Sequence, residues 1–127
     1  MTKRILVVED DRVSRDLARC VLTAGGYEVV CVTDAEEALL VLPDALPDLV
    51  LMDLNLPGID GLEATLILRE DPRTASIPIV VLSALAFAAD RERALKAGCA
   101  DYLTKPVGAR QLLDRVDGIL GVARARV

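Results

Sequence analysis

The chain has 127 residues, a length that fits one domain with a core large enough to need neither disulfides nor a structural metal. Its 20 acidic side chains outnumber its 15 basic ones and give a net charge of -5, which argues against a nucleic-acid or anionic-membrane partner. The apolar run near the N-terminus is too short for a signal peptide, and no later segment reaches membrane-spanning length. We therefore expect a single cytoplasmic domain over residues 1–127, with a core over about 3–120 and a loose C-terminal tail.

Short apolar runs rich in Val, Ile and Leu alternate with amphipathic segments along the whole chain. This pattern is typical of parallel strands that crossover helices bury on both faces. The predicted strands are Arg4–Glu9, Glu28–Val32, Asp48–Asp53, Pro78–Ser83 and Asp101–Thr104. Five β-α units predict an α/β fold with a doubly wound, five-stranded parallel sheet.

Five helices are predicted between and after these strands. The first ends before Gly25 and Gly26, the second begins with Asp34 as its N-cap, and glutamates occupy the first turn of the second. The third is expected over about Gly61–Arg69 and the fourth over about Phe87–Ala97. The apolar side chains at helical spacing are Val13, Leu17, Val21 and Leu22 on one face of the first helix, and Leu112, Leu113, Val116 and Leu120 on the last.

The three cysteines are Cys20, Cys31 and Cys99. Their number is odd, they lie far apart in the sequence, and the chain has no histidine to complete a zinc site with them. We therefore interpret each as a small buried hydrophobic side chain in a reducing cytoplasm.

Polar side chains gather where the predicted strands end. In a doubly wound sheet, sites form at the carboxyl ends of the strands, where the loops leave the sheet. The side chains at these ends are Glu9, Asp10 and Asp11 after the first strand, Asp53 at the end of the third, Ser83 at the end of the fourth, and Lys105 after the fifth. An acidic cluster, a hydroxyl and one ammonium are therefore expected at a common edge.

Each of these residues also has a purely structural interpretation. Asp10 or Asp11 could cap the first helix, Asp53 could open an Asx-turn, Ser83 could bond to nearby backbone, and Lys105 could be a solvated surface lysine. The combination favours function, because clustered carboxylates raise one another's pKa unless positive charge enters. A divalent cation together with Lys105 would supply that charge. Carboxylate and carbonyl oxygens without nitrogen or sulfur ligands indicate Mg²⁺ rather than a softer metal, and the absence of an EF-hand spacing disfavours Ca²⁺.

Four motifs then follow one another along nearly the whole chain: "RILVVEDD", "PDLVLMDLNLPGIDGLE", "IPIVVLSALA" and "AGCADYLTKP". Ser83 follows Asp53 by 30 residues, and Lys105 follows Ser83 by 22. In these motifs and intervals the chain resembles the receiver domain of two-component response regulators. The resemblance implies a flavodoxin-like (βα)5 sheet with strand order 2-1-3-4-5. It leaves open whether the chain is a single-domain regulator or a receiver taken from a longer protein such as a hybrid kinase.

The resemblance also implies a role for the acidic residues and their neighbours. Asp53 would be the phosphoacceptor and Asp10 a direct ligand of Mg²⁺. Glu9 stands where many relatives have aspartate and would act on the metal through water. Asn55 would offer its backbone carbonyl to the metal. Pro57, Gly58 and Gly61 would bend the chain away from Asp53 and leave room for phosphate.

Ser83 and Lys105 would bind the phosphoryl oxygens, and Ser83 with Tyr102 would form a conformational switch. Without the resemblance, Tyr102 is an amphipathic tyrosine packed at the edge of the sheet. The residues two after Asp53 and two after Ser83 flank the path of the hydrolytic water in this family. Here they are Asn55 and Leu85, and we expect Leu85 to shield the phosphoryl group and prolong its life.

Because the chain has no histidine, a separate protein must supply the phosphoryl group, either a sensor histidine kinase or a histidine phosphotransfer protein. The expected product is a regulatory acyl phosphate rather than turnover of a substrate, so we do not expect an enzyme in the ordinary sense. A downstream protein target is expected on the face formed by the fourth helix, fifth strand and fifth helix.

Two further classes stay open. A haloacid dehalogenase-type phosphohydrolase also has a nucleophilic aspartate at a strand end, but it needs a second aspartate two residues later, where this chain has Asn55. A phosphorylation-independent interaction module could keep the same fold, but the loss of the acids or of the lysine would signal it, and all of them are present here. A flavin- or nucleotide-binding protein is disfavoured because neither GxxxxGK[ST] nor GxGxxG occurs.

Overall fold

The structure is a computed structural model that describes residues 2–42, 45–56, 58–84 and 88–123. Strands and helices alternate along the chain. The strands are β1 (Arg4–Val8), β2 (Glu28–Val32), β3 (Leu49–Asp53), β4 (Ile79–Ser83) and β5 (Asp101–Thr104). The helices are α1 (Arg12–Ala24), α2 (Ala35–Val41), α3 (Gly61–Glu70), α4 (Ala88–Lys96) and α5 (Ala109–Leu120). No helix among the described residues is long and apolar enough to cross a membrane.

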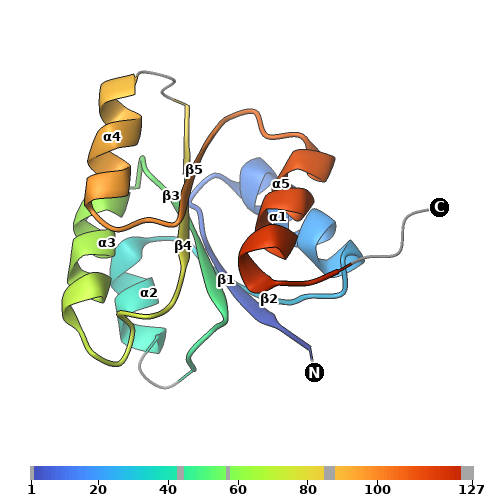
Figure 1. Cartoon of the computed structure of the whole chain (residues 1–127), viewed down its shortest axis with the longest axis horizontal. Coiled ribbons are helices and arrows are strands. Elements are labelled where there is room, and N and C mark those ends of the chain that lie inside the picture. Colours follow the sequence, from blue (N-terminus) through green and yellow to red (C-terminus); the bar gives the residue numbers. More distant parts are fainter. Residues whose placement is uncertain (1, 43–44, 57, 85–87, 124–127) are drawn as a thin grey trace.

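The five strands form one parallel sheet in the order β2-β1-β3-β4-β5. Helices α2, α3 and α4 cover one face of the sheet, and α1 and α5 cover the other (Figure 1). Two apolar clusters fill the spaces between the sheet and these two layers. The predicted doubly wound α/β fold and its strand order are confirmed.

The strand bounds differ from the predicted ones by one residue at three ends. Glu9, Asp48 and Pro78 fall outside β1, β3 and β4, whereas β2 and β5 have the predicted bounds. The backbone of Glu9 still donates to Val32 O at 3.1 Å, and that of Asp48 to Arg4 O at 2.8 Å. One such bond at an end residue does not extend the regular ladder, and differences of one residue are ordinary at strand ends.

Burial varies across the sheet. All residues of β3 and β4 are buried, as expected for central parallel strands. The prediction of burial on both faces is wrong for β2, where Glu28 and Val30 are exposed. The reason is its place at the edge of the sheet, where a strand has one neighbour and the covering layer ends.

Some apolar side chains of helix α1 are exposed to solvent. The predicted apolar residues of α1 are only partly buried, because Leu22 is buried, Val21 is half-buried and the other two are exposed. Val13 is 75% exposed and Leu17 is 57% exposed. Both lie on the N-terminal half of the helix, whereas Ala18 and Leu22 carry its packing against the sheet.

The prediction that all three cysteines are buried is correct only for Cys99. Cys20 lies on α1 and is exposed, and Cys31 lies on the edge strand β2 and is half-buried. Burial raises the pKa of the Cys99 thiol. The sequence spacing that excludes a zinc site does not by itself decide which side of its element a cysteine occupies.

Three aspartates cap helices. The side chains of Asp11, Asp34 and Asp60 accept bonds from Ser14 N, Glu37 N and Glu63 N at 2.9, 2.7 and 2.9 Å. Helix α3 begins at Gly61 and α2 at Ala35, in agreement with the sequence. Three predictions fall on residues outside the described part of the chain, namely the start of the fourth helix at Phe87, the bend at Pro57 and the shielding role of Leu85. The expected loose tail falls largely on 124–127, which is also outside it.

Gly61 lies where α3 comes closest to the end of β3. A Cβ at this position would lie 2.5 Å from Asp53 O and 2.9 Å from Leu54 Cα, both of them backbone atoms. We predict that Gly61→Ala lowers the free energy of unfolding by about 1–3 kcal/mol, because the loop after Asp53 must shift. Urea denaturation would measure the change.

Gly118 provides the matched control. It is exposed within α5, and a Cβ there meets nothing within 4 Å. Gly118→Ala should therefore leave the fold intact and stabilise it by about 0.5–1 kcal/mol. Equal stability of Gly61→Ala and the parent would contradict the tight approach of α3 to β3.

Candidate functional site

Three charged side chains meet at the carboxyl ends of β1, β3 and β5. Lys105 Nζ lies 2.6 Å from Glu9 Oε1 and 3.4 Å from Asp53 Oδ1. The side chains of Glu9 and Asp53 are 4% and 5% exposed, and that of Lys105 is 24% exposed. The residues that the sequence places at three strand ends are therefore in direct contact, and Lys105 is not a solvated surface lysine.

Asp10 completes an acidic cluster with Glu9 and Asp53. Each of the three can offer one carboxylate oxygen, and these oxygens lie within 4.8 Å of one another. Asp10 is exposed, whereas the other two are buried. The donor set consists of oxygen atoms alone and has an open side at Asp10, which fits a hard cation that keeps part of its water, as Mg²⁺ does.

The charges in the cluster are not balanced. Burial raises the pKa of the Glu9 carboxyl above its ordinary value of 4.5, and Asp53 acts in the same direction through a hydrogen bond and like charge, although Lys105 opposes both. Burial alone would lower the pKa of the Lys105 ammonium. The contacts with Glu9 and Asp53 outweigh it, so that the pKa of Lys105 is raised above 10.5. The Lys105 ammonium thus forms ion pairs with both buried acids.

The structural interpretations of the acids are partly correct and do not conflict with a site. Asp11, not Asp10, caps α1, and its backbone N–H donates to Glu9 Oε2 at 3.3 Å. Asp53 Oδ1 accepts the backbone N–H of Asn55 at 3.3 Å, the bond expected of an Asx-turn. The cap therefore leaves Asp10 with the acidic cluster, and the turn fixes the Asp53 carboxylate.

Ser83 and Tyr102 occupy the neighbouring strands. Ser83 is buried and comes one residue after Leu82, the partner of Asp53 in the β3–β4 register. The backbone N–H of Lys105 donates to Ser83 O at 2.7 Å. Tyr102 is 4% exposed and packs in the cluster beneath α2, α3 and α4. Ser83 and Tyr102 are therefore both buried in this structure.

One residue of the site was not predicted. Arg15, in the first turn and a half of α1, donates through Nη1 to Glu9 O at 3.1 Å and to Asp10 O at 3.3 Å. Helical side chains lean towards the N-terminus of their helix, so an arginine at this place can reach back to the preceding loop. That leaning is the signal that could have identified Arg15, which holds the backbone of two residues of the acidic cluster.

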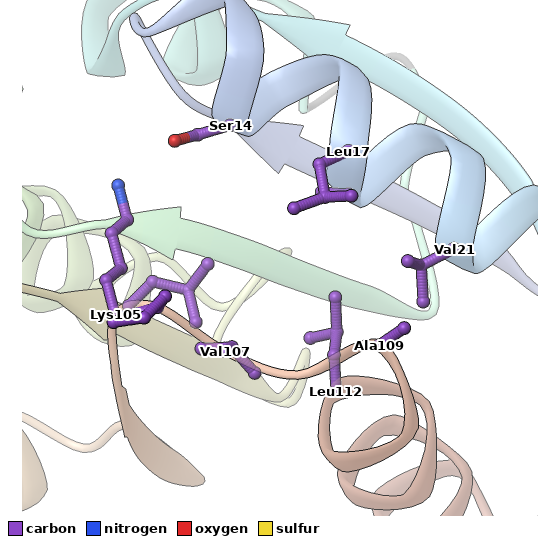
Figure 2. A pocket seen from close by; sticks show the side chains of 10 residues that line it. Ser14, Leu17, Val21, Lys105, Val107, Ala109 and Leu112 are labelled. Atoms are coloured by element: carbon purple, nitrogen blue, oxygen red, sulfur yellow. The ribbon is translucent and has the colours of Figure 1, made fainter.

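An apolar cavity of about 280 Å³ adjoins this cluster between α1 and α5. Figure 2 shows Lys105 at one end of it, with Val21 and Ala109 at the other. Leu17 and Leu112 lie on opposite sides of the space between these ends, and Val107 lies nearer Lys105 (Figure 2). The stem of Lys105 is therefore one wall of an apolar cavity, while its ammonium contacts the two acids.

With this geometry established, comparison with known proteins decides the family. The family model described as the response regulator receiver domain matches residues 5–117. The chain belongs to the response regulator receiver family. This result selects a receiver domain in two-component signalling over the phosphohydrolase and nucleotide-binding alternatives.

Named relatives agree with the assignment. The receiver is 36% identical over 123 residues to the polar-differentiation response regulator DivK of Brucella ovis, which covers 97% of this chain and 100% of DivK. It superposes with a TM-score of 0.88 and 35% identity on the receiver domain of a sensor histidine kinase from Pseudomonas aeruginosa, covering 95% of this chain and 99% of that one. That structure has a magnesium ion coordinated in its active-site cleft. A CheY-like receiver from Methanospirillum hungatei gives a TM-score of 0.88 at 29% identity, with 95% of each chain covered.

The raised pKa of Glu9 predicts how the stability of the metal-free receiver depends on pH. Above about pH 4.5 Glu9 is ionised in the unfolded chain, whereas in the folded receiver its raised pKa keeps it protonated to a higher pH. The folded state therefore loses stability as the pH rises towards the pKa of Glu9 in the folded receiver. Glu9→Gln removes this loss. We expect the free energy of unfolding of Glu9→Gln minus that of the parent to increase from about pH 4.5 to neutral pH, as measured by urea denaturation with a chelator present.

The same measurement on Glu37→Gln is the control, since Glu37 is an exposed glutamate outside the acidic cluster. A difference for Glu9→Gln that stays constant or shrinks with pH would show that the Glu9 carboxylate is not disfavoured in the folded state.

Proposed function

We propose that this receiver takes up one phosphoryl group on Asp53 from a phosphohistidine of a separate protein, in the cytoplasm. The observation that carries the proposal is the contact of Lys105 with both Glu9 and Asp53 at the carboxyl ends of three strands. Asp53 is held by Lys105 and by the Asn55 backbone, so its carboxylate is oriented before any phosphodonor arrives. The donor is a sensor histidine kinase or a histidine phosphotransfer protein, because this chain has no histidine.

The reaction is a transfer between two nucleophiles. A carboxylate oxygen of Asp53 attacks phosphorus in line, a P–O bond forms, and the P–N bond to the donor imidazole breaks with its electron pair on nitrogen. The product is an acyl phosphate on Asp53 and a neutral histidine on the donor after proton uptake. Lys105 and the hydroxyl of Ser83 bind the phosphoryl oxygens in this proposal.

Asp10, Asp53 and the backbone carbonyl of Asn55 would hold Mg²⁺, and Glu9 would act on it through water. The clustered oxygens of the three acids support this assignment. The cation, when bound, would offset the negative charge of the transferred group. The residues of the chain orient the phosphoryl group and keep the acids in place for it.

The phosphoryl group would be read out through Ser83 and Tyr102. Ser83 moves towards the phosphoryl group, and the space it leaves favours the inward position of Tyr102, so that the face of α4, β5 and α5 changes for a downstream protein target. The burial of Tyr102 among the side chains beneath α2, α3 and α4 supports a role inside the core for this tyrosine.

We predict that acetyl phosphate and MgCl₂ together add the mass of one phosphoryl group to the parent receiver, and that Asp53→Asn adds none. Intact-mass spectrometry measures the product. Asp10→Asn should slow uptake by about 10²-fold or more, since it removes a ligand of the cation. Stable labelling of Asp53→Asn at the parent level would contradict the assignment of the phosphoacceptor.

Asp11→Asn is the matched control. Asparagine caps a helix about as well as aspartate, so this variant removes an acid next to Asp10 without removing the cap. It should label at the parent rate. A folded parent that takes up no phosphoryl group under any of these conditions would instead indicate the phosphorylation-independent interaction module.

The switch predicts a remote response. Adding beryllofluoride with MgCl₂ should shift backbone NMR signals at Tyr102 and along α4 and α5, as well as at Asp53. In Ser83→Ala the signals around Asp53 should still move while those at Tyr102 should move much less. Shifts confined to the residues around Asp53 in the parent would exclude Tyr102 as a readout.

A further inference from the structure

A carboxylate from α2 holds the loop that follows the phosphoacceptor. The backbone N–H of Ile59 donates to Glu36 Oε1 at 2.8 Å, across 23 residues of sequence. Ile59 lies in the loop between β3 and α3, and Glu36 lies in the first turn of α2. The bond therefore joins two elements that follow different strands.

Gly58 lies directly against this contact. Its φ is +74°, and a Cβ at this position would lie 2.5 Å from Glu36 Oε1. A side chain here would thus meet the carboxylate that Ile59 binds, and the backbone conformation also favours glycine. The glycine that the sequence explains only as a bend is also the residue that lets Glu36 approach the loop.

Glu36 has no other assignment among the acids of its turn. Asp34 is the N-cap of α2, and Glu37 Oε2 accepts the hydroxyl of Thr33, the residue before that cap, at 3.3 Å. These two acids serve the helix itself. Glu36 instead points its carboxylate to the loop after β3.

The loop is held at both of its ends as well. The backbone N–H of Asn55 donates to Asp53 Oδ1 at 3.3 Å, and that of Gly61 donates to Leu54 O at 3.1 Å. Glu36 adds a third attachment between these two, on the far side of Asn55 from Asp53. Asn55, Leu54 and Ile59, described residues on either side of position 57, are therefore bonded to β3, to α3 and to α2 respectively.

We propose that Glu36 is a positioning residue of the metal site, which fixes the β3–α3 loop so that the Asn55 carbonyl is preordered for the divalent cation. The inference rests on the proposed function, because it takes Asn55 as a ligand of Mg²⁺. Glu36 does not contact the cation. It acts through its bond to Ile59 beside Gly58. Without this bond the loop must become ordered when the cation binds, which lowers the affinity for the cation.

Three variants separate this role from a general effect on stability. Glu36→Ala removes the acceptor for Ile59 N–H. Glu36→Gln keeps an acceptor oxygen and removes the charge. Glu37→Ala removes the acceptor of the Thr33 hydroxyl and destabilises the same turn of α2 without touching the loop. Urea denaturation without metal ranks the stabilities of all three, and calorimetric titration with MgCl₂ measures the affinity of each.

We expect Glu36→Ala to weaken Mg²⁺ binding by about threefold to tenfold, the range of one typical intramolecular hydrogen bond. Glu36→Gln should recover most of the affinity, and Glu37→Ala should bind Mg²⁺ like the parent despite its lower stability. Amide hydrogen exchange at Ile59 should be faster in Glu36→Ala than in the parent or in Glu37→Ala.

Equal Mg²⁺ affinity of Glu36→Ala and the parent would overturn the inference and leave the proposed function intact. Weakening of the same size in Glu36→Gln would also overturn it, because it would trace the effect to the charge of Glu36 rather than to the bond. A parent that binds no Mg²⁺ would contradict the proposed function itself, which the titration of the parent reports separately.

Discussion

Two buried carboxylates share one ammonium in this protein, and the rest of the structure accommodates that imbalance. Glu9 and Asp53 are both withdrawn from water and both within reach of Lys105. Two buried carboxylates repel each other, so the rest of the fold must be stable enough to hold them side by side. A parallel sheet does this, because the ends of β1, β3 and β5 point to one edge whatever the side chains there. The packing of the apolar core therefore determines where these three charged side chains lie.

The neighbours of the cluster hold its backbone and donate backbone N–H groups to its carboxylates. Arg15 binds the carbonyls of Glu9 and Asp10, and the turn at Asn55 binds Asp53. Gly61 lets α3 start directly against the end of β3. Each contact fixes where an acid sits and leaves its charge largely uncompensated. A site of this kind is ready for a cation and a phosphoryl group because it is stable without being neutral.

The sequence predicts the framework well because the framework rests on local patterns. Apolar runs of strand length and amphipathic segments give the element order, and the strand ends give Glu9, Asp53, Ser83 and Lys105 as neighbours. What it misses depends on tertiary position. The exposure of Cys20 and of Leu17 depends on how α1 lies on its neighbours, and the exposure of Val30 on which strand forms the edge.

The contacts made by Arg15 and Glu36 were missed for a related reason. Both side chains bind backbone atoms, and a backbone acceptor or donor leaves no mark on the sequence at its own position. Gly58 is the exception, since its φ of +74° favours glycine there. The burial of Tyr102 likewise depends on the space beneath α2, α3 and α4, which no motif describes.

The central claim is that the unbalanced acids form one cation site at the strand ends. A crystal of the receiver grown with MnCl₂, with data collected at the manganese edge, tests it most directly. The account predicts one strong anomalous peak bound by the carboxylates of Asp10 and Asp53 and by the Asn55 carbonyl, with Glu9 beyond direct reach. A peak elsewhere on the molecule, or none at this edge of the sheet in a manganese-saturated crystal, would contradict it.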